Sequence, residues 1–414
     1  MAEHHTHDLL VIGGGPAGLS AAIAAAESGL RVGVVDESPS LGGRLLGQLH
    51  QKPGTSGAWW NGIEIANGLI ERATAVGVDQ YPRTTVWDLQ SGFHTFATRD
   101  GLQQRFDAER VLVATGAAEE PVPVPGWELP GVLSIGGAQV VTNVHRVRPG
   151  RRAVIIGINI LSVAIARELA LAGVTVVGLV LPTPSLVSAA RATPSVVVRD
   201  LIDLARMAPS PLLRTAGPLV AGLGLHGLAT RLFPRSGVRL WDMPIRPTTC
   251  ALRITGDDQV TGVDLAHLTP DGRVVDGSVR HVEADLVCIA GGLYPLIELA
   301  NTAGCVSYHD DDLGGHVPLH DDRYRSTVPG LYVAGNTTGI EGAEVAMAQG
   351  HAAGLAIAHD ATGRDALDAR FRAAADHVVA TRSAADIRFI PTIERGRSAV
   401  ADAWTRYASH GRAQ

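Results

Sequence analysis

Apolar residues occur in blocks along the chain, and the first block indicates a strand, a helix and a second strand within residues 8–36. Residues 9–12 and 32–35 are short continuous apolar runs, which are typical of strands buried on both faces. The stretch between them begins with glycines and continues with alanines, the best helix formers. The pattern therefore predicts a βαβ unit with a glycine turn between its first strand and its helix.

A helix and a small antiparallel sheet are predicted next. Residues 56–76 space apolar side chains as on one face of a helix. Residues 78–107 alternate apolar and polar positions around a turn at Asp100 and Gly101, as in a β-meander. Residues 108–116 form another apolar strand, which ends in Ala-Thr-Gly.

The βαβ pattern repeats in the middle of the chain, with apolar strands at 153–156 and 174–181. Residues 189–241 then predict helices, and residues 251–282 predict antiparallel strands with glycine-containing turns. Residues 284–290 are again an apolar strand.

Beyond these strands the chain returns to helical patterns. A strand at 330–334 precedes a small-residue helix, and residues 363–414 predict two helical pieces on either side of Pro391. The whole pattern predicts an α/β protein with two Rossmann-like three-layer domains, the second inserted in the first, and a helical C-terminal tail.

Charge and composition exclude several functions. The formal net charge of −6 argues against nucleic acid as a partner, because phosphate binding needs clustered cations. Lys52 is the single lysine and does not lie in a Gly-Lys-Ser/Thr context, so neither a P-loop nor Schiff-base chemistry is supported. The longest apolar stretch, 153–181, contains Arg167 and Glu168, so no membrane span is predicted.

Cysteine usage points to a reducing compartment. The three cysteines, Cys250, Cys288 and Cys305, form no Cys-x-x-Cys motif, which excludes a dithiol redox centre and a cysteine-only iron–sulfur cluster. The polar N-terminus lacks the features of a signal peptide. We therefore expect a cytoplasmic location.

The glycine turn at residues 13–18 contains a G-x-G-x-x-G motif. Gly13 permits the tight reversal, Gly15 lets the backbone approach a pyrophosphate, and Gly18 lets helix and strand pack closely. The phosphates would lie at the helix N-terminus, where free N–H groups and the helix dipole favour negative charge. Asp36 ends the second strand where a carboxylate can bind the ribose hydroxyls. These residues predict a dinucleotide site.

Further segments resemble those of known flavoproteins. The glycine turn, the Ala-Thr-Gly at 114–116 and the Thr-Val-Pro-Gly-Leu-Tyr-Val-Ala-Gly-Asn at 327–336 look like the FAD-contacting segments of the glutathione and thioredoxin reductase class. More specific are Pro-Gly-Trp-Glu-Leu-Pro-Gly-Val at 125–132 and Gly-Gly-Ala-Gln at 136–139. With them the chain resembles the FAD-binding subunits of heteromeric bacterial amino-acid and amine dehydrogenases: opine oxidase, hydroxyproline dehydrogenase, hydrogen cyanide synthase and the related part of sarcosine oxidase.

The resemblance implies that FAD is the cofactor. It implies a discontinuous FAD-binding domain at 1–120 and 284–362, a degenerate NAD(P)-binding-like domain at 121–283, and a helical tail at 363–414. The residues expected to bind FAD are Gly13, Gly15, Pro16, Ala17, Gly18, Asp36, Glu37, Gly43, Arg44, Val86, Ala114, Thr115, Gly116, Gly335, Asn336, Glu344 and Val345.

The chain departs from the family pattern at Asn336, where the family has an aspartate that accepts a hydrogen bond from the ribityl chain of the flavin. An amide oxygen can still accept, but one negative charge is lost. The helix that follows would point its N-terminus at the pyrimidine end of the flavin. We therefore expect a modestly raised flavin reduction potential.

The second βαβ unit departs further from a nucleotide-binding pattern. Gly157 keeps the turn, but Asn159 stands where a second glycine should meet a pyrophosphate. Asparagine tolerates a positive φ, so the turn can survive, while its side chain takes the space of the phosphate. The second strand ends at Pro182 with no carboxylate for a ribose. A structural relic or a partner-docking surface is favoured over an NAD(P) site.

Gln48 and His50 are the candidate catalytic residues, because they follow the Gly-Gly-Arg loop at 42–44 and could face the flavin ring. His50 could transfer a proton near neutral pH; the alternative is that it caps a loop. Trp59 and Trp60 are interpreted as core or subunit interface, with a wall facing the flavin or substrate as the alternative.

Two other segments are given structural interpretations. Residues 309–322 are dense in histidine and aspartate without a clear ligand spacing, so we expect a solvated loop and no metal site. The apolar, glycine-rich segment 216–229 is interpreted as core or interface, with His226 as a packed histidine.

The leading hypothesis is an FAD-dependent oxidoreductase, a subunit of a heteromeric dehydrogenase that oxidises a C–N bond of an amino acid, opine or amine. The expected partners are that small-molecule substrate and other flavoprotein or iron–sulfur subunits. Because no cysteine follows Cys305, we expect residues 306–414 not to form the cysteine-rich [2Fe–2S] module of several relatives. The alternatives are an FAD-carrying structural or electron-relay subunit, and an NAD(P)H-dependent reductase of the ferredoxin-reductase kind.

Overall fold

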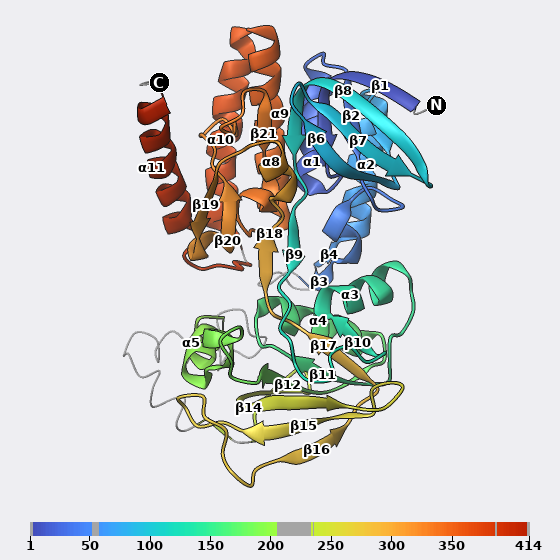
Figure 1. Cartoon of the computed structure of the whole chain (residues 1–414), viewed down its shortest axis with the longest axis vertical. Helices are drawn as coiled ribbons and strands as arrows, with labels where there is room; N and C mark the ends of the chain where they lie inside the picture. Colours follow the sequence, from blue (N-terminus) through green and yellow to red (C-terminus); the bar gives the residue numbers. More distant parts are fainter. Residues whose placement is uncertain (1–2, 52–57, 205–232, 235, 386, 412–414) are drawn as a thin grey trace. The chain divides into compact units, whose positions relative to one another are not determined.

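The structure is a computed structural model, and it describes residues 3–51, 58–204, 233–234, 236–385 and 387–411 (Figure 1). Lys52 and the segment 216–229 with His226 lie outside the described residues. The chain forms two compact units. Unit 1 comprises Met1–Leu46, Asn61–Ala118 and Leu293–Gln414, and unit 2 comprises Gly47–Trp60 and Glu119–Gly292.

Unit 1 is built on a sheet whose strands run in the order β5-β2-β1-β8-β7-β6, with β21 beside β8. The bounds are β1 Glu3–Ile12, β2 Val32–Val35, β5 Asp79–Tyr81, β6 Thr84–Gln90, β7 His94–Arg99, β8 Leu102–Val113 and β21 Leu331–Val333. The long strand β8 pairs with antiparallel β7 through its first half and with parallel β21 through its last three residues. Parallel strands β5, β2, β1, β8 and β21 therefore end along one edge.

The helices of unit 1 include both predicted pieces of the tail. They are α1 Pro16–Glu27, α2 Gly62–Ala75, α8 Glu298–Thr302, α9 Ala343–Thr362, α10 Asp365–Ala384 and α11 Ile393–Gly411. The short strands β19 Ser307–Asp310 and β20 Gly315–Pro318 form a hairpin around the 3₁₀ turn η5 Asp311–Leu313. Sequence periodicity predicted the helix at 56–76, although residues 59–61 are extended as strand β4.

Helices α1 and α9 pack unusually closely, because glycines and alanines line their contact. A Cβ atom added to Gly350 would lie 2.0 Å from the carbonyl oxygen of Ala17, and one added to Gly354 would lie 2.3 Å from that of Ala21. Helix α10 packs on the other side of α9 through Leu367. Helix α1, which begins directly after the glycine turn, therefore packs directly against the middle of α9.

Unit 2 is built on a second sheet, of order β10-β17-β11-β12-β14-β15-β16, with β13 beside β14. The strands are β10 Val132–Ser134, β11 Arg152–Ile156, β12 Thr175–Pro182, β13 Val238–Leu240, β14 Met243–Thr255, β15 Gly262–His267, β16 Arg280–Glu283 and β17 Leu286–Ile289. The helices are α3 Ile135–Gln139, which continues as the π-helix η2 Val140–Val144, α4 Ile160–Leu171 and α5 Pro194–Leu204. The two remaining strand pairs are β3 Leu49–Gln51 with β4 Trp59–Asn61, and β9 Ala117–Glu119 with β18 Leu293–Pro295.

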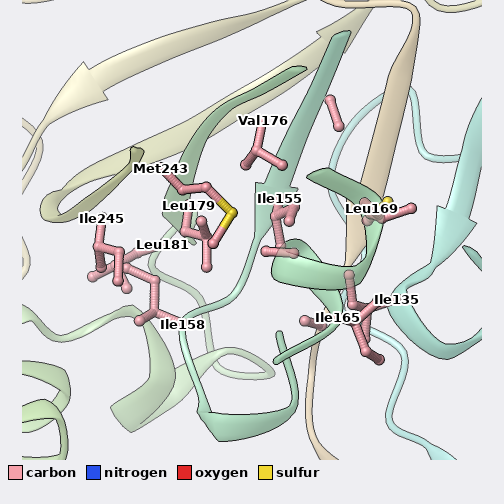
Figure 2. Packing of buried hydrophobic residues seen from close by; sticks show 14 of the residues in the cluster. Ile135, Ile155, Ile158, Ile165, Leu169, Val176, Leu179, Leu181, Met243 and Ile245 are labelled. Carbon is pink, nitrogen blue, oxygen red and sulfur yellow. The ribbon is translucent and has the colours of Figure 1, made fainter. Parts of the chain in front are cut away.

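The core of unit 2 lies between its sheet and its helices. Side chains of the parallel strands, such as Ile155 and Leu179, belong to one buried cluster with Ile165 and Leu169 of α4 (Figure 2). Each fully buried side chain of this size contributes about 1.5–3 kcal/mol to folding. The predicted fold class is confirmed: the chain is α/β, with a second Rossmann-like unit inserted in the first and a helical tail.

The compact units do not follow the predicted domain limits at every point. Residues 47–60 belong to unit 2, and the helices of the tail belong to unit 1. The assignment of 1–120 and 284–362 as one functional domain and 121–283 as another stays a prediction. Among the described helices, none is both long and apolar enough to cross a membrane.

Candidate flavin site

The predicted cofactor residues of unit 1 gather where its parallel strands end. Gly13 follows β1, Ala114 follows β8, and Gly335 comes two residues after β21. Backbone hydrogen bonds connect these ends: the Ala114 N–H donates to the Ile12 carbonyl oxygen (2.8 Å), and the Ala334 N–H donates to that of Val113 (3.3 Å). In open α/β sheets this carboxyl edge is where ligands bind.

The glycine turn has the geometry that its motif predicts. Gly13 adopts φ +105°, and an added Cβ would lie 2.4 Å from the carbonyl oxygen of Ala114. A Cβ on Gly18 would lie 1.9 Å from the carbonyl oxygen of Gly13. A Cβ on Gly15, in contrast, would meet no described atom within 4 Å. Of these three glycines, Gly15 is therefore the one that faces free space.

Helix α1 begins at this open position. Gly15 is its N-cap and Pro16 its first residue, and no side chain in the described part of the chain caps it. Ala17, the next residue, is buried against α9. The first N–H groups and the positive end of the helix dipole are thus available to an anion such as a pyrophosphate.

Asp36 is held in place by two backbone donors. Its Oδ2 accepts from the Gly14 N–H (2.7 Å), and its Oδ1 accepts from the Ser38 N–H (2.8 Å). Each carboxylate oxygen retains a further lone pair for a ribose hydroxyl. Glu37, which was also expected to contact FAD, is exposed.

The Gly-Gly-Arg loop crosses over the glycine turn. Gly43 adopts φ +53°, and an added Cβ would lie 2.9 Å from the Cα of Gly15. Arg44 is exposed and donates through Nη2 to the carbonyl oxygen of Ala117 (3.2 Å). Val86, expected at the cofactor, is half-buried on β6 at an irregularity in its pairing with β7.

A threonine that the sequence did not single out joins two of the predicted segments. The buried Thr337 hydroxyl accepts from the Gly116 N–H (3.0 Å), while the Thr115 hydroxyl donates to the Leu296 carbonyl oxygen (2.8 Å). Gly116 adopts φ +77°, and an added Cβ would meet no described atom within 4 Å. The position of Thr337 directly after Gly335-Asn336 was the only signal that could have found it.

The segment Gly335–Thr338, labelled η6, leads into α9. Gly335 adopts φ +72°, and an added Cβ would lie 2.6 Å from the Cβ of Ala17. The Asn336 Oδ1 accepts from the backbone N–H of Glu341 (3.1 Å), so this side chain already ties the loop together. Of the two expected residues in the first turn of α9, Val345 is buried and Glu344 is exposed.

Gln48 and His50 belong to unit 2, whereas every predicted FAD contact belongs to unit 1. Within unit 2 both face Trp60, whose Nε1 donates to the Gln48 Oε1 (2.9 Å) and whose ring stacks on His50. Trp60 itself is buried. The catalytic roles of Gln48 and His50 stay predictions.

A buried carboxyl group anchors the backbone between these two residues. Glu168 of α4, 5% exposed, accepts from the Leu49 N–H (3.3 Å), Gln139 Nε2 (2.8 Å) and Asn143 Nδ2 (2.7 Å). Burial raises the pKa of Glu168 to about 7, although the three N–H donors act in the opposite direction. In the sequence, Glu168 stood out only because it interrupts an apolar stretch.

The second glycine turn follows the same backbone course as the first, but the Asn159 side chain fills the space that is open in the first. Gly157 adopts φ +113°, and an added Cβ would lie 2.1 Å from the carbonyl oxygen of Ala290. Asn159 is the N-cap of α4: its Oδ1 accepts from the Ser162 N–H (2.9 Å), and its Nδ2 donates to the Ala290 carbonyl oxygen (3.1 Å). The backbone of Asn159 is extended, with φ −150°, so the turn does not need the positive φ that asparagine was expected to tolerate here. The side chain thus occupies donors that a phosphate would need.

The histidine- and aspartate-rich segment at 309–322 is mostly a hairpin. His309 and His316 face each other across β19 and β20, with ring centroids 4.6 Å apart. Burial lowers the pKa of His320 to about 4. Across the described residues there is no group of three or more histidine, cysteine or acidic side chains arranged to hold a metal ion.

The residues of unit 1 fit an FAD molecule. They offer free space beside Gly15 and Gly116, an uncapped helix N-terminus and a fixed carboxylate at Asp36. These are the groups that would receive the pyrophosphate and the ribose of a dinucleotide.

Comparison with known proteins agrees with this geometry. Residues 7–200 match the family described as pyridine nucleotide-disulphide oxidoreductase, and residues 317–365 match that of glucose inhibited division protein A. The opine oxidase A-type subunit of Rhizobium meliloti is 30% identical over 368 residues, 86% of this chain and 63% of that protein. The HcnB subunit of hydrogen cyanide synthase from Pseudomonas protegens is 27% identical over 363 residues, 84% of this chain and 69% of that protein.

Solved structures share the fold. L-proline dehydrogenase from P. horikoshii superposes with a TM-score of 0.62 at 20% identity, over 90% of this chain and 60% of that chain. Thioredoxin reductase of T. acidophilum superposes with a TM-score of 0.59 at 20% identity, over 86% of this chain and 99% of that chain.

Residues 7–200 are thus similar to the pyridine nucleotide-disulphide oxidoreductase family, as the motifs of the chain predicted, and FAD is the cofactor that this similarity implies. The chain's relatives include proteins named as subunits of opine oxidase and of hydrogen cyanide synthase. The chain spans 63% and 66% of the length of two opine oxidase subunits that it matches.

Proposed function

We propose that this chain is the FAD-carrying subunit of a heteromeric dehydrogenase that oxidises a C–N bond of an amino acid, opine or amine. The observation that carries the proposal is the contrast between the two glycine turns. The turn at Gly15 is open to a dinucleotide, whereas Asn159 caps the helix of the second turn. Because the first of these two turns is open and the second is filled, we infer that reducing equivalents come from an organic substrate and not from NAD(P)H.

The names of the relatives support a C–N substrate. Two relatives from Rhizobium meliloti are subunits of opine oxidase and of sarcosine oxidase, enzymes named for an opine and for sarcosine. The sarcosine oxidase subunit, alpha, is 33% identical over 194 residues, 43% of this chain and 19% of that protein. Opines and sarcosine share an amine nitrogen next to the carbon that is oxidised. Because both relatives are named as subunits, a partner chain is supported too.

The residues of this chain would divide the work as follows. The N-terminus of α1 and Asp36 would bind the pyrophosphate and ribose, and Gly335 and Asn336 would lie along the ribityl chain. When bound, FAD would supply the acceptor for the two electrons of the C–H bond next to the amine nitrogen. His50 is the proposed proton-transfer residue, and Gln48 is the second candidate catalytic residue.

The test is anaerobic reduction of the flavin, with the chain alone and with its candidate partner chains. Bleaching of the flavin absorbance by an amine or amino acid in the lone chain supports the proposal. Bleaching only in the complex favours the alternative in which the partner holds the catalytic flavin and this chain relays electrons. Bleaching by NADPH or NADH contradicts the proposal and favours a reductase.

A further inference from the structure

A buried ion cluster connects the C-terminal helices to the loop that precedes α9. The Glu341 side chain, 5% exposed, accepts from Arg382 of α10 through Nε (2.5 Å) and Nη2 (3.2 Å), and from Arg397 of α11 through Nη2 (2.6 Å). Gln349 of α9 donates a further hydrogen bond to it (2.8 Å). We call Glu341, Arg382 and Arg397 the tail clamp. Both arginine side chains are themselves 12–15% exposed.

The tail clamp also holds the middle of the loop before α9, which comprises residues 335–342 and which we call the flavin loop. Arg397 donates through Nη1 to the carbonyl oxygen (2.7 Å) and the hydroxyl (2.9 Å) of Thr338. Gln349, which contacts Glu341, accepts from the Gly335 N–H through its Oε1 (3.1 Å). The flavin loop is therefore held at both ends by side chains of α9 and α11.

The flavin loop lies at the carboxyl edge of the sheet in unit 1. It begins two residues after β21 and contains Gly335 and Asn336, both expected to contact FAD. It ends at Gly342, the N-cap of the 20-residue helix α9. A shift of the loop would move both the cofactor residues and the positive end of that helix.

The tail clamp carries a net positive charge. Two guanidinium groups face one carboxylate, and the charges of Arg397 and Arg382 hold the pKa of Glu341 below its usual range in spite of burial. Tyr324, which lies near all three, is neutral because burial raises its pKa to about 12. Glu394 of α11 also faces Arg382, and Glu344 in the first turn of α9 is exposed. In a poorly hydrated site a charge acts over a longer distance than in water.

We propose that helices α10 and α11 are part of the flavin site, and that Arg382 and Arg397 are positioning residues which fix the flavin loop through Glu341 and keep a positive charge beside it. The inference rests on FAD binding by unit 1 and is independent of which substrate is oxidised.

The experiment compares Arg397→Gln and Glu341→Gln in the full chain. Each variant breaks the same buried ion cluster, so each should weaken FAD binding at least tenfold in a fluorescence titration. The flavin reduction potential, measured by equilibration with a redox dye, should move in opposite directions. Arg397→Gln removes a positive charge and should lower it, whereas Glu341→Gln removes a negative charge and should raise it.

Two further variants complete the test. Arg397→Lys keeps the positive charge but loses the several hydrogen bonds that the guanidinium group donates. The flavin reduction potential of this variant should therefore stay near that of the wild type even if its FAD affinity falls. Arg395→Gln is the matched control on the same helix, because Arg395 is exposed and pairs with Asp312 outside the flavin loop. Its FAD affinity should remain within about twofold of the wild type, as expected for an exposed ion pair.

Three results would overturn the proposal: potentials that shift in the same direction in Arg397→Gln and Glu341→Gln, unchanged FAD affinity in both, or an equal loss in Arg395→Gln. If Arg397→Gln does not fold, the potential of Arg397→Lys decides: a value far from the wild type contradicts the electrostatic role. None of these readouts needs a substrate, so they remain valid if the C–N substrate is wrong.

Discussion

Gly15 and Gly18 stand three positions apart in one turn, yet a methyl group added to each would meet different surroundings. At Gly18 it would overlap the carbonyl oxygen of Gly13, whereas at Gly15 it would project into free space. The backbone of Gly15 is also in a region open to any residue, with φ −76° and ψ −172°. Folding therefore depends on Gly18, and cofactor access depends on Gly15.

Gly15→Ala should leave the free energy of unfolding of the FAD-free protein unchanged and weaken FAD binding at least tenfold, about 1.4 kcal/mol. Gly18→Ala should lower the free energy of unfolding by about 1–3 kcal/mol, because the added methyl overpacks the turn. Denaturant unfolding of the FAD-free protein and fluorescence titration with FAD measure the two effects.

The control for this pair is Gly68→Ala in α2, where an added Cβ meets no described atom within 4 Å. Alanine should stabilise that helix by up to about 1 kcal/mol and leave FAD affinity unchanged. A Gly15→Ala protein that binds FAD like the wild type would refute the placement of the pyrophosphate at α1.

Asn336 offers a second prediction at the level of one residue. Its Oδ1 accepts from the Glu341 N–H, and an aspartate could accept the same hydrogen bond. Asn336→Asp should therefore keep the loop intact and add one negative charge, which lowers the flavin reduction potential. Equilibration with a redox dye measures it, and an unchanged or higher potential would contradict the expectation.

The sequence revealed the site residues whose roles depend on contacts within a short stretch of the chain. Gly13, Gly15 and Gly18 belong to one short motif, and their surroundings are the turn itself and the end of a neighbouring strand. Thr337 was missed because the N–H that it binds, that of Gly116, lies 221 positions away. Asn159 was recognised as an obstacle, and its N-cap bond with Ser162 is local, but its second hydrogen bond, to the carbonyl oxygen of Ala290, lies 131 positions away and no local pattern indicates it.

Among the elements, α4 carries a group that should make stability depend on pH. The pKa of Glu168 is raised by burial from its ordinary 4.5 to about 7, so the folded state binds this proton more tightly than the unfolded state. The stabilisation is fully present below about pH 4.5, falls as pH rises, and is lost above about pH 7. The shift corresponds to about 3 kcal/mol.

Glu168→Gln removes the titrating carboxyl group. The glutamine amide also introduces an N–H donor next to the three N–H groups that donate to Glu168 in the wild type. Between about pH 4.5 and pH 8, the wild type should lose up to about 3 kcal/mol more free energy of unfolding than the variant. Denaturant unfolding of both proteins at the two pH values measures this difference. Equal pH dependence in the two proteins would show that Glu168 does not titrate in this range.

Apolar periodicity predicted which helices and strands form better than it predicted which of them pack together. Apolar spacing predicted the strands of both βαβ units and the two tail helices, whereas residues 238–240, expected to be helical, form strand β13. Residues 47–60 were assigned to the FAD-binding domain, and they belong to compact unit 2, where Glu168 accepts from the Leu49 N–H across 119 positions. Likewise, nothing in the sequence of the tail helices indicated that Arg382 and Arg397 would form ion pairs with Glu341.

At the scale of the whole molecule, two βαβ units share one backbone plan and differ in what their first helix can bind. Gly13 and Gly157 both adopt a positive φ and press against the carbonyl oxygen of a neighbouring strand end, Ala114 or Ala290. The N-cap is Gly15 in one unit and Asn159 in the other. Duplication of the fold therefore does not imply duplication of the dinucleotide site.

The central claim is that FAD in unit 1 takes electrons from a C–N substrate and not from a nicotinamide dinucleotide. The most direct test mixes the FAD-loaded chain anaerobically, first alone and then with its partner chains, with NADH, with NADPH and with a panel of opines, N-methyl amino acids and cyclic amino acids. We predict that at least one of these amines promptly bleaches the flavin absorbance of the lone chain, and that both dinucleotides leave it unchanged. Prompt bleaching by NADH or NADPH, with none by the amines, would contradict this claim.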